Sequence, residues 1–438
     1  MNILVLYHYE GEYPVRAATA DHLYCFGKYA GPRCVYVNLA FRRIPRYVKR
    51  IKFDLVIFHT LFLSARWHRA LFEGVLETVA VLKSQTGAVK VALPQDEFLN
   101  TDLLNEFIND FGVDYVFSVA PESEWGKIYD AVDRQRVKFA RVLTGYLDEQ
   151  TLKKIDSLQS SMPQRVIDVG YRAYHAPAWL GRHGLLKVEI ADVFRDAARE
   201  SGLVADISTR ARDTFLGDAW YEFLLRCKFM IGVEGGASIL DSDGSIRART
   251  EAYVHNHPEA GFEKIEAACF PNLDGNLNLF AISPRHLEAC ATRTCQVLVE
   301  GEYNGVLRPG QHYIELRRDL GNLPQVIEAM KDDQLRQDIT ERAWQDVVAS
   351  GRYTYSSFVR QILETALAER APQPESAAPS RLLLWWAALA DRLSWMSVMF
   401  HWYVILNPKR KVRRWLVNTF SEEAVSSAMR RIKRKAQV

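Results

Sequence analysis

The stretch Ile3-Leu-Val-Leu-Tyr7 is a run of five apolar residues with no polar residue between them. A strand that is buried on one face alternates polar and apolar residues, so an unbroken run predicts a strand covered on both faces. Helical patterns at Leu63–Ser84 and Thr101–Phe111 separate further runs of this kind. Such alternation predicts a doubly wound parallel α/β sheet. The further runs are Val35–Leu39, Leu55–His59, Val89–Leu93, Tyr115–Val119 and Val137–Leu143.

A second series of strands and helices begins after a polar stretch at Leu152–Pro163. With 438 residues the chain is too long for one hydrophobic core, so we place a domain boundary in this stretch. We expect two Rossmann-like domains, 1–155 and 164–370, that face each other across a cleft. The expected strands are Arg165–Val169, Ala205–Ser208, Phe229–Val233 and Gln296–Val299. The expected helices are Val188–Ser201, Ala219–Arg226, Pro284–Ala291, Leu323–Ala349 and Tyr355–Arg370.

The last part of the chain has a different composition. Residues 371–380 are rich in Pro, Ser and Ala and predict a linker. Residues 381–438 form a tail, in which Asp391, Ser394, Ser397 and His401 trace one polar stripe. The opposite, apolar positions recur at helical spacing and predict an amphipathic helix. They are Leu382, Trp385, Trp386, Leu389, Leu393, Met396, Phe400 and Tyr403.

Formal charge is distributed unevenly along the chain. Residues 407–438 carry ten Lys or Arg against two Glu, about +8, whereas the whole chain carries +3, which leaves about −5 on the rest. A basic tail on an acidic body predicts a polyanionic partner for the tail alone, and we expect no nucleic-acid partner. Burying Asp391 and Arg392 in a bilayer would cost roughly 2.5 to 3.5 kcal/mol each. The favoured interpretation is therefore a helix lying on an anionic membrane surface. Packing on the body and a membrane span are the alternatives.

The six cysteines show no paired spacing, and no secretory signal pattern precedes the first strand. We therefore expect reduced thiols in a cytoplasmic protein attached peripherally to the inner face of the cell membrane.

Ligands of doubly wound sheets bind at the carboxyl ends of the strands, so the residues that follow each strand are candidates. The loop after the first strand lacks a Gly-x-Gly-x-x-Gly pattern, which argues against a dinucleotide-dependent oxidoreductase. Asp96 and Glu97 follow the fourth strand and could accept a proton from an acceptor hydroxyl as catalytic groups. The alternative is that one of them caps the next helix.

The second half carries candidate donor-binding residues. Arg172, Arg182 and Lys187 could neutralise a diphosphate, although any one of them could equally be a surface cation. Gly235 and Gly236, next to Glu234, could let backbone amides approach a ligand. Asp241 and Asp243 nominally form a carboxylate pair for a metal, but a polar turn or a sugar contact is the favoured interpretation.

Ile282-Ser-Pro-Arg-His-Leu-Glu-Ala289 is the most specific stretch. Ser283 is a good N-cap, and Pro284 fits the first helical position. The helix would begin with free amides facing the cleft, beside Arg285, and so offer a site for a diphosphate. Glu288 could accept hydrogen bonds from ribose hydroxyls, or it could serve only the helix dipole.

These motifs resemble the C-terminal domain of GT-B glycosyltransferases, in particular bacterial family-1-like transferases related to spore-maturation proteins. The resemblance covers about residues 165–367. Its matching pieces are Asp168-Val-Gly-Tyr-Arg172, Gly232-Val-Glu-Gly-Gly-Ala-Ser238, Ser283-Pro-Arg-His-Leu-Glu-Ala289, Gly301-Glu-Tyr-Asn-Gly305 and Pro309-Gly-Gln-His-Tyr-Ile-Glu-Leu316.

The resemblance implies roles for individual residues. Glu288 matches the second acid of the family's Glu-x7-Glu motif, which holds the nucleotide ribose. The first acid would fall at Phe280, so this chain departs from the pattern, and Asp274 or Glu234 could substitute. Arg172 and Lys187 resemble the pair that neutralises the diphosphate, so no metal and no other cofactor is expected.

The expected function is that of a hexosyltransferase. It would move a sugar from a nucleotide diphosphate donor to a lipid-linked or polysaccharide acceptor in cell-envelope glycan synthesis. A sugar-nucleotide epimerase of the same fold and a noncatalytic sugar-nucleotide-binding scaffold protein are the alternatives.

Overall fold

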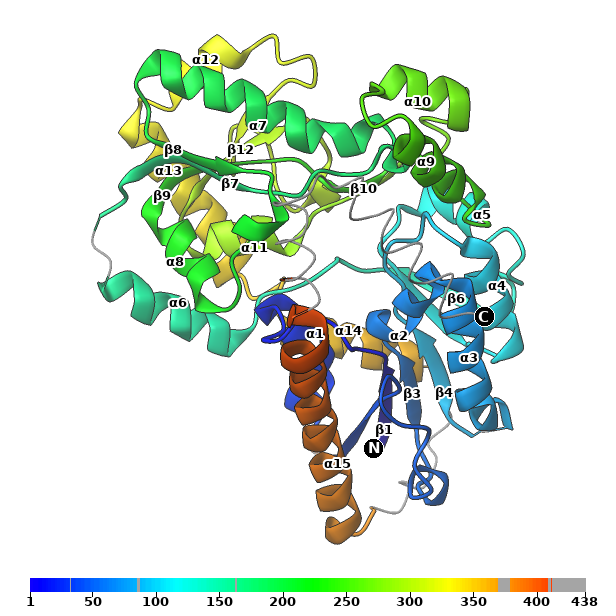
Figure 1. Cartoon of the computed structure of the whole chain (residues 1–438). Helices are drawn as coiled ribbons and strands as arrows, with labels where there is room; N and C mark the ends of the chain where they lie inside the picture. The colour runs from blue at the N-terminus through cyan, green and yellow to red at the C-terminus, as the bar shows by residue number, and fades with distance from the viewer. Residues whose placement is uncertain (32, 85–86, 162–163, 369–378, 409–410, 412–438) are drawn as a thin grey trace.

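The computed structural model describes the chain except residues 32, 85–86, 162–163, 369–378, 409–410 and 412–438. Its first part forms a parallel sheet in the order β2-β1-β3-β4-β5-β6 (Figure 1). Every residue of β1 and β3 is buried, which confirms the prediction from the unbroken apolar runs. The strands are β1 (Ile3–Tyr7), β2 (Cys34–Asn38), β3 (Leu55–Phe58), β4 (Val89–Ala92), β5 (Tyr115–Ser118) and β6 (Lys138–Arg141).

The helix predicted at Leu63–Ser84 is broken in the structure, and that prediction is wrong. The chain leaves helical geometry at His68, whose φ of −127° and ψ of 102° are extended. The reason is Arg66, whose buried guanidinium turns inward and donates to backbone carbonyls, among them that of Leu63. The helices of this region are α1 (Ala17–Tyr29), α2 (Thr60–Leu63), α3 (Arg69–Val79), α4 (Thr101–Asp110) and α5 (Trp125–Ile128).

The second part forms a parallel sheet in the order β13-β12-β9-β7-β8. Within each sheet the second strand along the chain lies at one edge, next to the first, and the later strands extend the other side. The chain therefore forms two Rossmann-like domains, as the resemblance to GT-B enzymes implies. The strands are β7 (Ile167–Arg172), β8 (Ala205–Ser208), β9 (Cys227–Gly232), β12 (Cys295–Val299) and β13 (Ile314–Leu316), with a separate antiparallel pair β10 (Gly235–Ala237) and β11 (Leu279–Ala281).

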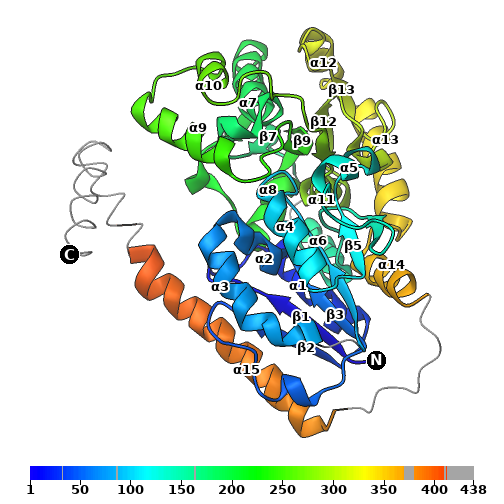
Figure 2. The same cartoon turned by 90° about the vertical axis from the view of Figure 1, so that its right-hand side faces the viewer.

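Helices cover this second sheet on both faces (Figures 1 and 2). The predicted stretch Leu323–Ala349 divides into α12, α13 and a short π-helical turn. The polar boundary stretch at Leu152–Pro163 is largely helical, within α6. The helices are α6 (Glu149–Ser161), α7 (Arg182–Ser201), α8 (Asp218–Arg226), α9 (Ser245–Asn256), α10 (Phe262–Cys269), α11 (Pro284–Ala291), α12 (Leu323–Ala329) and α13 (Asp333–Ala343).

The chain returns to the first domain before residue 370. Helix α14 (Tyr355–Leu367) packs beside α1, and its Tyr355, Phe358 and Ile362 belong to the apolar cluster that covers one face of the first sheet. The range 164–370, expected as the second domain, thus includes a helix of the first. Sequence periodicity identifies the helix but not the sheet that its apolar face covers.

The two domains are also tied together away from their chain crossings. The amide of Asn100 donates to the carbonyl of Asp241 at 2.8 Å, and the amide of Asp241 donates to the carbonyl of Phe98 at 2.8 Å. One continuous apolar cluster runs from the first sheet to Trp179 and Ile246 of the second domain. The domains are therefore joined along one side.

Helix α15 (Arg381–Phe400) lies along edge strand β2 (Figure 2). Its polar stripe faces the body, because Asp391 accepts hydrogen bonds of 2.7 Å from the hydroxyls of Tyr7 and Tyr24. The alternative in which this helix packs on the body therefore holds for its polar face. Within the described residues, no helix combines the length and apolar character that a bilayer span requires. The expected linker 371–380, except its last two residues, and the tail beyond 411 lie outside the described residues.

Candidate functional site

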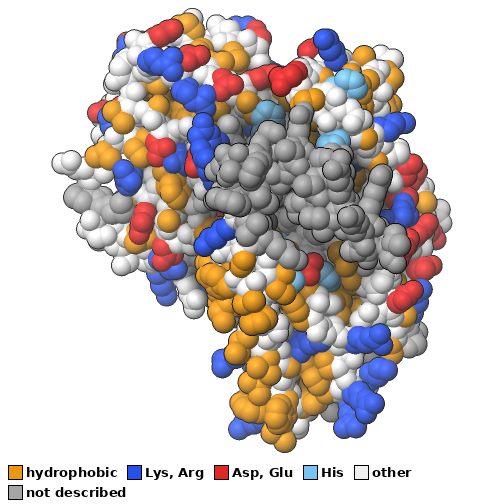
Figure 3. Space-filling view, in the orientation of Figure 1, with side chains coloured by type: hydrophobic (Ala, Val, Ile, Leu, Met, Phe, Trp, Pro, Cys, Tyr) orange, Lys and Arg blue, Asp and Glu red, His pale blue; other side chains and the backbone are white. Residues whose placement is uncertain are grey.

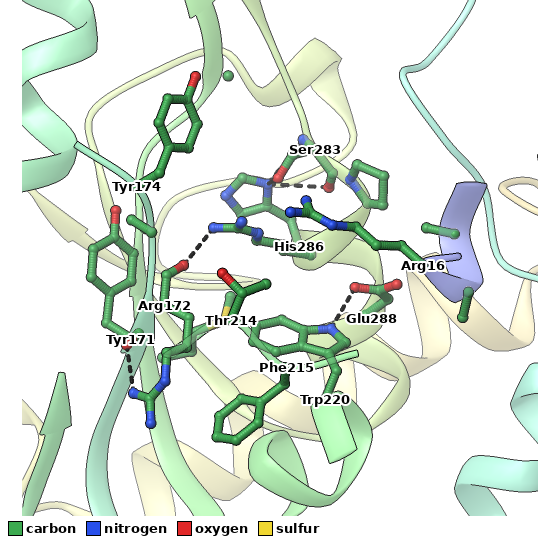
Figure 4. A pocket seen from close by; sticks show the side chains of 18 of the residues that line it. Arg16, Tyr171, Arg172, Tyr174, Thr214, Phe215, Trp220, Ser283, His286 and Glu288 are labelled. Atoms are coloured by element: carbon green, nitrogen blue, oxygen red, sulfur yellow. Dashed lines mark hydrogen bonds between the residues drawn. The ribbon is translucent and has the colours of Figure 1, made fainter. Parts of the chain in front are cut away.

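One cavity lies at the point where the strand order of the second sheet reverses. It has a volume of about 380 Å³, which is within the range of small-molecule sites. Residues that end β7 and β9 form its floor, and Arg16 with the first turn of α1 closes it from the other domain (Figure 4). Sheets of this type bind ligands at this reversal, so the topology alone selects this cavity.

Glu288 reaches the cavity from α11, whose expected bounds at Pro284–Ala291 are confirmed. Its Oε2 accepts a hydrogen bond of 2.7 Å from the indole Nε1 of Trp220, which belongs to α8 (Figure 4). Burial raises the pKa of Glu288 to about 6, although the Trp220 bond and the charge of Arg285 oppose the shift. The second carboxylate oxygen can still accept hydrogen bonds from vicinal hydroxyls of a ligand.

The start of α11 is more saturated than the sequence suggests. Ser283 caps the helix through a reciprocal arrangement in which its side chain accepts from the amide of His286, while the His286 ring accepts from the amide of Ser283. Pro284 has no amide hydrogen. The amide of His286 is thus already used, and position 284 offers none. The first turn therefore supplies fewer free amide donors than the sequence predicts.

Three cationic side chains line the cavity: Lys187, Arg285 and Arg16. Loss of hydration lowers the pKa of Lys187 to about 8, with a further lowering by the charge of Arg285 and an opposing effect of Asp96. Arg285 is anchored through one nitrogen, which donates to the carbonyl of Arg172 at 2.5 Å. Arg16 is exposed and extends from the first domain toward Ser283 (Figure 4). The site thus offers positive charge from both domains.

Arg172 lines the cavity only near its backbone, and its guanidinium points away from Glu288 (Figure 4). It donates to the carboxylate of Asp206 at 2.7 Å and to backbone carbonyls of Asp206 and Asp213. The group also lies over the ring of Phe215, 4.8 Å from its centroid. Its donors therefore stabilise the second domain, and Arg285 occupies the place on the cavity wall that the sequence assigned to Arg172.

Glu234, Gly235 and Gly236 lie behind or beside the cavity. Gly235 lines it, whereas Glu234 is buried and accepts a hydrogen bond of 2.7 Å from the amide of Tyr303. Gly236 has a φ of +115°, and an added Cβ would meet the carbonyl oxygen of Leu279 at 1.8 Å. The second glycine is therefore required by the pairing of β10 with β11.

Among the described residues that line the cavity, no acid is present besides Glu288. The Phe280 ring stacks on His183 with centroids 3.9 Å apart. Asp274 accepts from the Ser238 hydroxyl at 2.6 Å and pairs with Arg182, whose guanidinium lies 3.4 Å away. Both candidate substitutes, Asp274 and Glu234, are thus engaged inside the domain, and Arg182 is paired outside the cavity. Neither substitute supplies the first acid of the Glu-x7-Glu motif at the cavity.

Asp96 is the first of the two adjacent acids predicted as catalytic groups. It follows β4 with a left-handed φ of 52°, which is uncommon for a residue with a side chain. The buried guanidinium of Arg66 imposes this geometry by donating to the carbonyls of Gln95 and Asp96 at 2.7 and 2.6 Å. The side chain of Asp96 is exposed to solvent, and it lies close enough to Lys187 for the two charges to interact.

Glu97 points into the core of the first domain. It is fully buried, and its carboxylate accepts hydrogen bonds from the hydroxyls of Ser118 and Tyr129 and from the amide of Val119 at 2.9 Å. These three bonds fix the loops that follow β4 and β5. The structure thus separates the two adjacent acids, since Asp96 is exposed and Glu97 is buried in a supporting position.

Asp241 and Asp243 are occupied by local backbone bonds. Asp241 accepts from the amides of Ile246 and Arg247 at the start of α9, and Asp243 accepts from the amide of Ser245. Among the residues that the structure describes, no group of three or more His, Cys, Asp or Glu is arranged as a metal site.

Three important residues were not identified from the sequence. Arg16 precedes a helix in the first domain, Trp220 lies in an ordinary amphipathic helix, and Arg66 interrupts one. Each acquires its role only through a contact with a distant segment. An arginine on the apolar side of a predicted helix, as at Arg66, is the one pattern that could have indicated an inward-facing charge.

No protein-family model matches the chain, and no curated protein matches its sequence. Among solved structures it is similar to HepE from Anabaena in complex with UDP, with 12% identity, a TM-score of 0.47 and coverage of 84% of this chain and 100% of that chain. A glycosyltransferase from Rickettsia africae has 11% identity and a TM-score of 0.43, with coverage of 84% of this chain and 99% of that chain. Sucrose-phosphate synthase from Thermosynechococcus elongatus has 10% identity and a TM-score of 0.44, with coverage of 83% of this chain and 98% of that chain. Likenesses this weak do not bear on function, which is inferred from the site.

Proposed function

We propose that the protein is a glycosyltransferase that takes a sugar from a nucleoside diphosphate donor. The observation that carries the proposal is the cavity at the strand reversal of the second sheet. It joins a buried carboxylate, Glu288, to the cations Lys187, Arg285 and Arg16 in one volume of about 380 Å³. Vicinal ribose hydroxyls match a carboxylate, and a diphosphate matches several fixed cations.

The chemistry follows from the charge distribution. Breaking the bond between the sugar and the diphosphate leaves negative charge on the leaving oxygen, and groups that stabilise this charge lower the barrier. Lys187 and Arg285 come from the second domain, whereas Arg16 comes from the first. Closure of the two domains around a donor would therefore bring all three onto the diphosphate. In this proposal the side chains, with no metal ion, neutralise the leaving group.

The acceptor would approach from the first domain. Asp96 lies at the carboxyl end of β4, near enough to Lys187 for each charge to shift the pKa of the other group. A carboxylate in this place can take the proton of an acceptor hydroxyl as the new glycosidic bond forms. The proposed transfer is of a hexose to a glycan or lipid-linked acceptor in envelope polysaccharide synthesis. The proposed location is the cytoplasmic face of the cell membrane, with residues 381–438 as the attachment.

A thermal-shift screen of the full chain against nucleoside diphosphates and their sugars tests the donor half of the proposal. We expect stabilisation by one nucleotide series, and an absence of any shift across the series would overturn the proposal. Product analysis with the best donor then separates three activities. Transfer to an added acceptor supports a glycosyltransferase, release of an epimerised sugar indicates an epimerase, and binding without turnover indicates a scaffold.

A further inference from the structure

Helix α15 and the turn that follows it, His401–Leu406, expose a continuous set of large apolar side chains. Of the fifteen large hydrophobic residues exposed among the described residues, nine lie in this one segment. We call them the α15 ridge, and Figure 3 shows apolar side chains gathered over this part of the surface. An apolar surface of this extent marks a contact with another phase or molecule. The members are Leu382, Trp385, Trp386, Leu393, Met396, Met399, Phe400, Tyr403 and Val404.

The outward direction of the ridge is fixed by contacts on the inner face of the helix. Asp391 is buried and bonded to Tyr7 and Tyr24, and the indole of Trp395 donates to the Tyr24 hydroxyl. Turning the apolar side inward would leave the Asp391 carboxylate without these partners and expose the two tyrosines. A buried carboxylate with two strong donors therefore holds the apolar side toward the solvent.

A basic loop lies next to the ridge. Between β2 and β3, residues 40–53 contain six Lys or Arg and no acid. Five of these basic side chains are exposed, and Phe41 in the same loop contacts the ring of His401 with centroids 5.9 Å apart. We call the exposed set the basic loop. It consists of Arg43, Arg46, Lys49, Arg50 and Lys52.

The end of the ridge reaches the entrance of the cavity. The ring of Tyr403 meets the ring of Tyr13 edge-on at 6.2 Å, and Tyr13 lies three residues before Arg16, which lines the cavity. Figure 1 shows the last turns of α15 next to the beginning of α1. A surface that contacts the ridge therefore also comes close to the loop between Tyr9 and Arg16.

We infer that the α15 ridge and the basic loop together form a docking surface for an anionic lipid bilayer, and that this surface holds the cavity entrance at the membrane. Indole, aliphatic and basic groups side by side match the interfacial zone of a bilayer, where tryptophan lies at the headgroups and lysine and arginine bind anionic lipid. The geometry selects, within the proposed function, an acceptor that is itself anchored in the membrane. The reactive group of such an acceptor would enter past Tyr13.

The test uses the full chain and vesicles of phosphatidylcholine, alone or mixed with phosphatidylglycerol. We expect co-flotation with the anionic vesicles only, and weaker binding at high salt. The variant Trp385→Ser/Trp386→Ser and the variant Arg43→Gln/Arg46→Gln/Lys49→Gln should each lower vesicle affinity by about tenfold or more. Leu71→Ser/Val254→Ser is the matched control, since these apolar residues are exposed elsewhere, and it should bind like the unaltered protein.

Hydrogen exchange of the vesicle-bound chain locates the contact. We expect protection at residues 8–16, 40–52 and 381–406, and none at α12 and α13. Protection that omits 8–16 would overturn the placement of the entrance, and unchanged flotation of both altered proteins would overturn the docking surface. Nucleotide-induced thermal shifts, measured on the same proteins, should be identical for all variants. Their loss would count against the proposed function rather than against the docking surface.

Discussion

The indole nitrogen of Trp220 donates a hydrogen bond of 2.7 Å to Glu288, which joins helix α8 to helix α11 across the back of the cavity. The bond occupies one carboxylate oxygen and holds the other in a defined direction. A ligand hydroxyl can then be bound by a group that is already oriented, which limits the entropy lost on binding.

Removal of the Glu288 carboxylate should weaken nucleotide binding. Glu288→Ala is expected to cost about 1.5 to 3 kcal/mol in nucleotide affinity, because a hydrogen bond to a charged acceptor is lost. Trp220→Phe should have a smaller effect of the same sign, since it only releases the carboxylate. Calorimetry with the nucleotide found by thermal shift measures both. Glu302→Ala, an exposed acid outside the cavity lining, serves as control. Equal affinity of folded Glu288→Ala and the unaltered protein would contradict the site.

Nucleotide affinity should be greatest between pH 6 and 8. The pKa of Glu288 is raised to about 6, so its carboxylate, which accepts from ribose, forms only as the pH rises through that value. The pKa of Lys187 is lowered to about 8, so its charge is lost above that value. Calorimetry over this range should give a bell-shaped profile. Glu288→Gln should abolish its acid limb, and Lys187→Met its alkaline limb. If both limbs persist in both variants, other groups are responsible.

The same Glu288 pKa predicts an effect on stability in the absence of nucleotide. The folded-state value of about 6 lies above the ordinary value of 4.5, so protonation favours the folded state. This contribution is complete below pH 4.5 and is lost as the pH rises through 6. The difference in unfolding free energy between the unaltered protein and Glu288→Gln should change over this interval and stay constant above it. A constant difference from pH 4 to 7 would contradict the shift.

Arg285 should contribute to nucleotide affinity, whereas Arg172 should contribute to the stability of the fold. Arg285→Met, alone or with Lys187→Met, should reduce affinity for a nucleoside diphosphate but not for the nucleoside, by about 1.5 to 3 kcal/mol per charged contact. Arg172→Met should instead lower the melting temperature, because its partners are carbonyls and the carboxylate of Asp206. Activity at saturating donor should be largely retained in this variant when measured well below its melting temperature. The reverse pattern would restore Arg172 as the diphosphate ligand.

Asp96 should affect transfer more than binding. Asp96→Asn is expected to lower the transfer rate by about 10²- to 10⁴-fold, the usual contribution of a positioned base, with little change in nucleotide affinity. Asp110→Asn, in an exposed carboxylate of the same domain, is the matched control. Glu97→Gln should mainly destabilise the fold, since Glu97 is fully buried. An unchanged transfer rate in Asp96→Asn would remove this residue from the mechanism.

Addition of a chelator should leave transfer activity intact, because the proposed leaving-group charge is met by Lys187, Arg285 and Arg16. Asp241→Ala should cost about 1 kcal/mol of stability through loss of a helix cap, without a change in the metal response. Loss of activity with chelator, restored by magnesium, would contradict both expectations.

The strands could be predicted because their signal is local. The bounds of β1, β8 and α11 agree with the sequence expectation, since an unbroken apolar run or a Ser-Pro helix start depends on neighbouring residues only. Local sequence could not show that the side chains of the adjacent acids Asp96 and Glu97 point in different directions. Their opposite directions are set by Arg66, Ser118 and Tyr129, which lie in other segments.

The orientation of α15 shows the same limit. Its polar and apolar stripes are plain in the sequence, but the choice of which stripe faces the protein depends on Tyr7 and Tyr24, more than 360 residues away along the chain. For the same reason the cavity cations were assigned only in part. Lys187 lines the cavity as expected, whereas Arg172 found partners in its own domain and Arg16 came from the other one.

The return of α14 and α15 to the first sheet has a consequence for biosynthesis. The ribosome releases the six strands of the first domain early, but two helices that cover that domain are synthesised after the whole second domain. Until then, the apolar face later covered by Phe358 and Ile362 remains open to other nascent chains. The second domain, whose strands and helices are contiguous in sequence, can complete its core first. The domain that begins the chain is therefore the last to be finished.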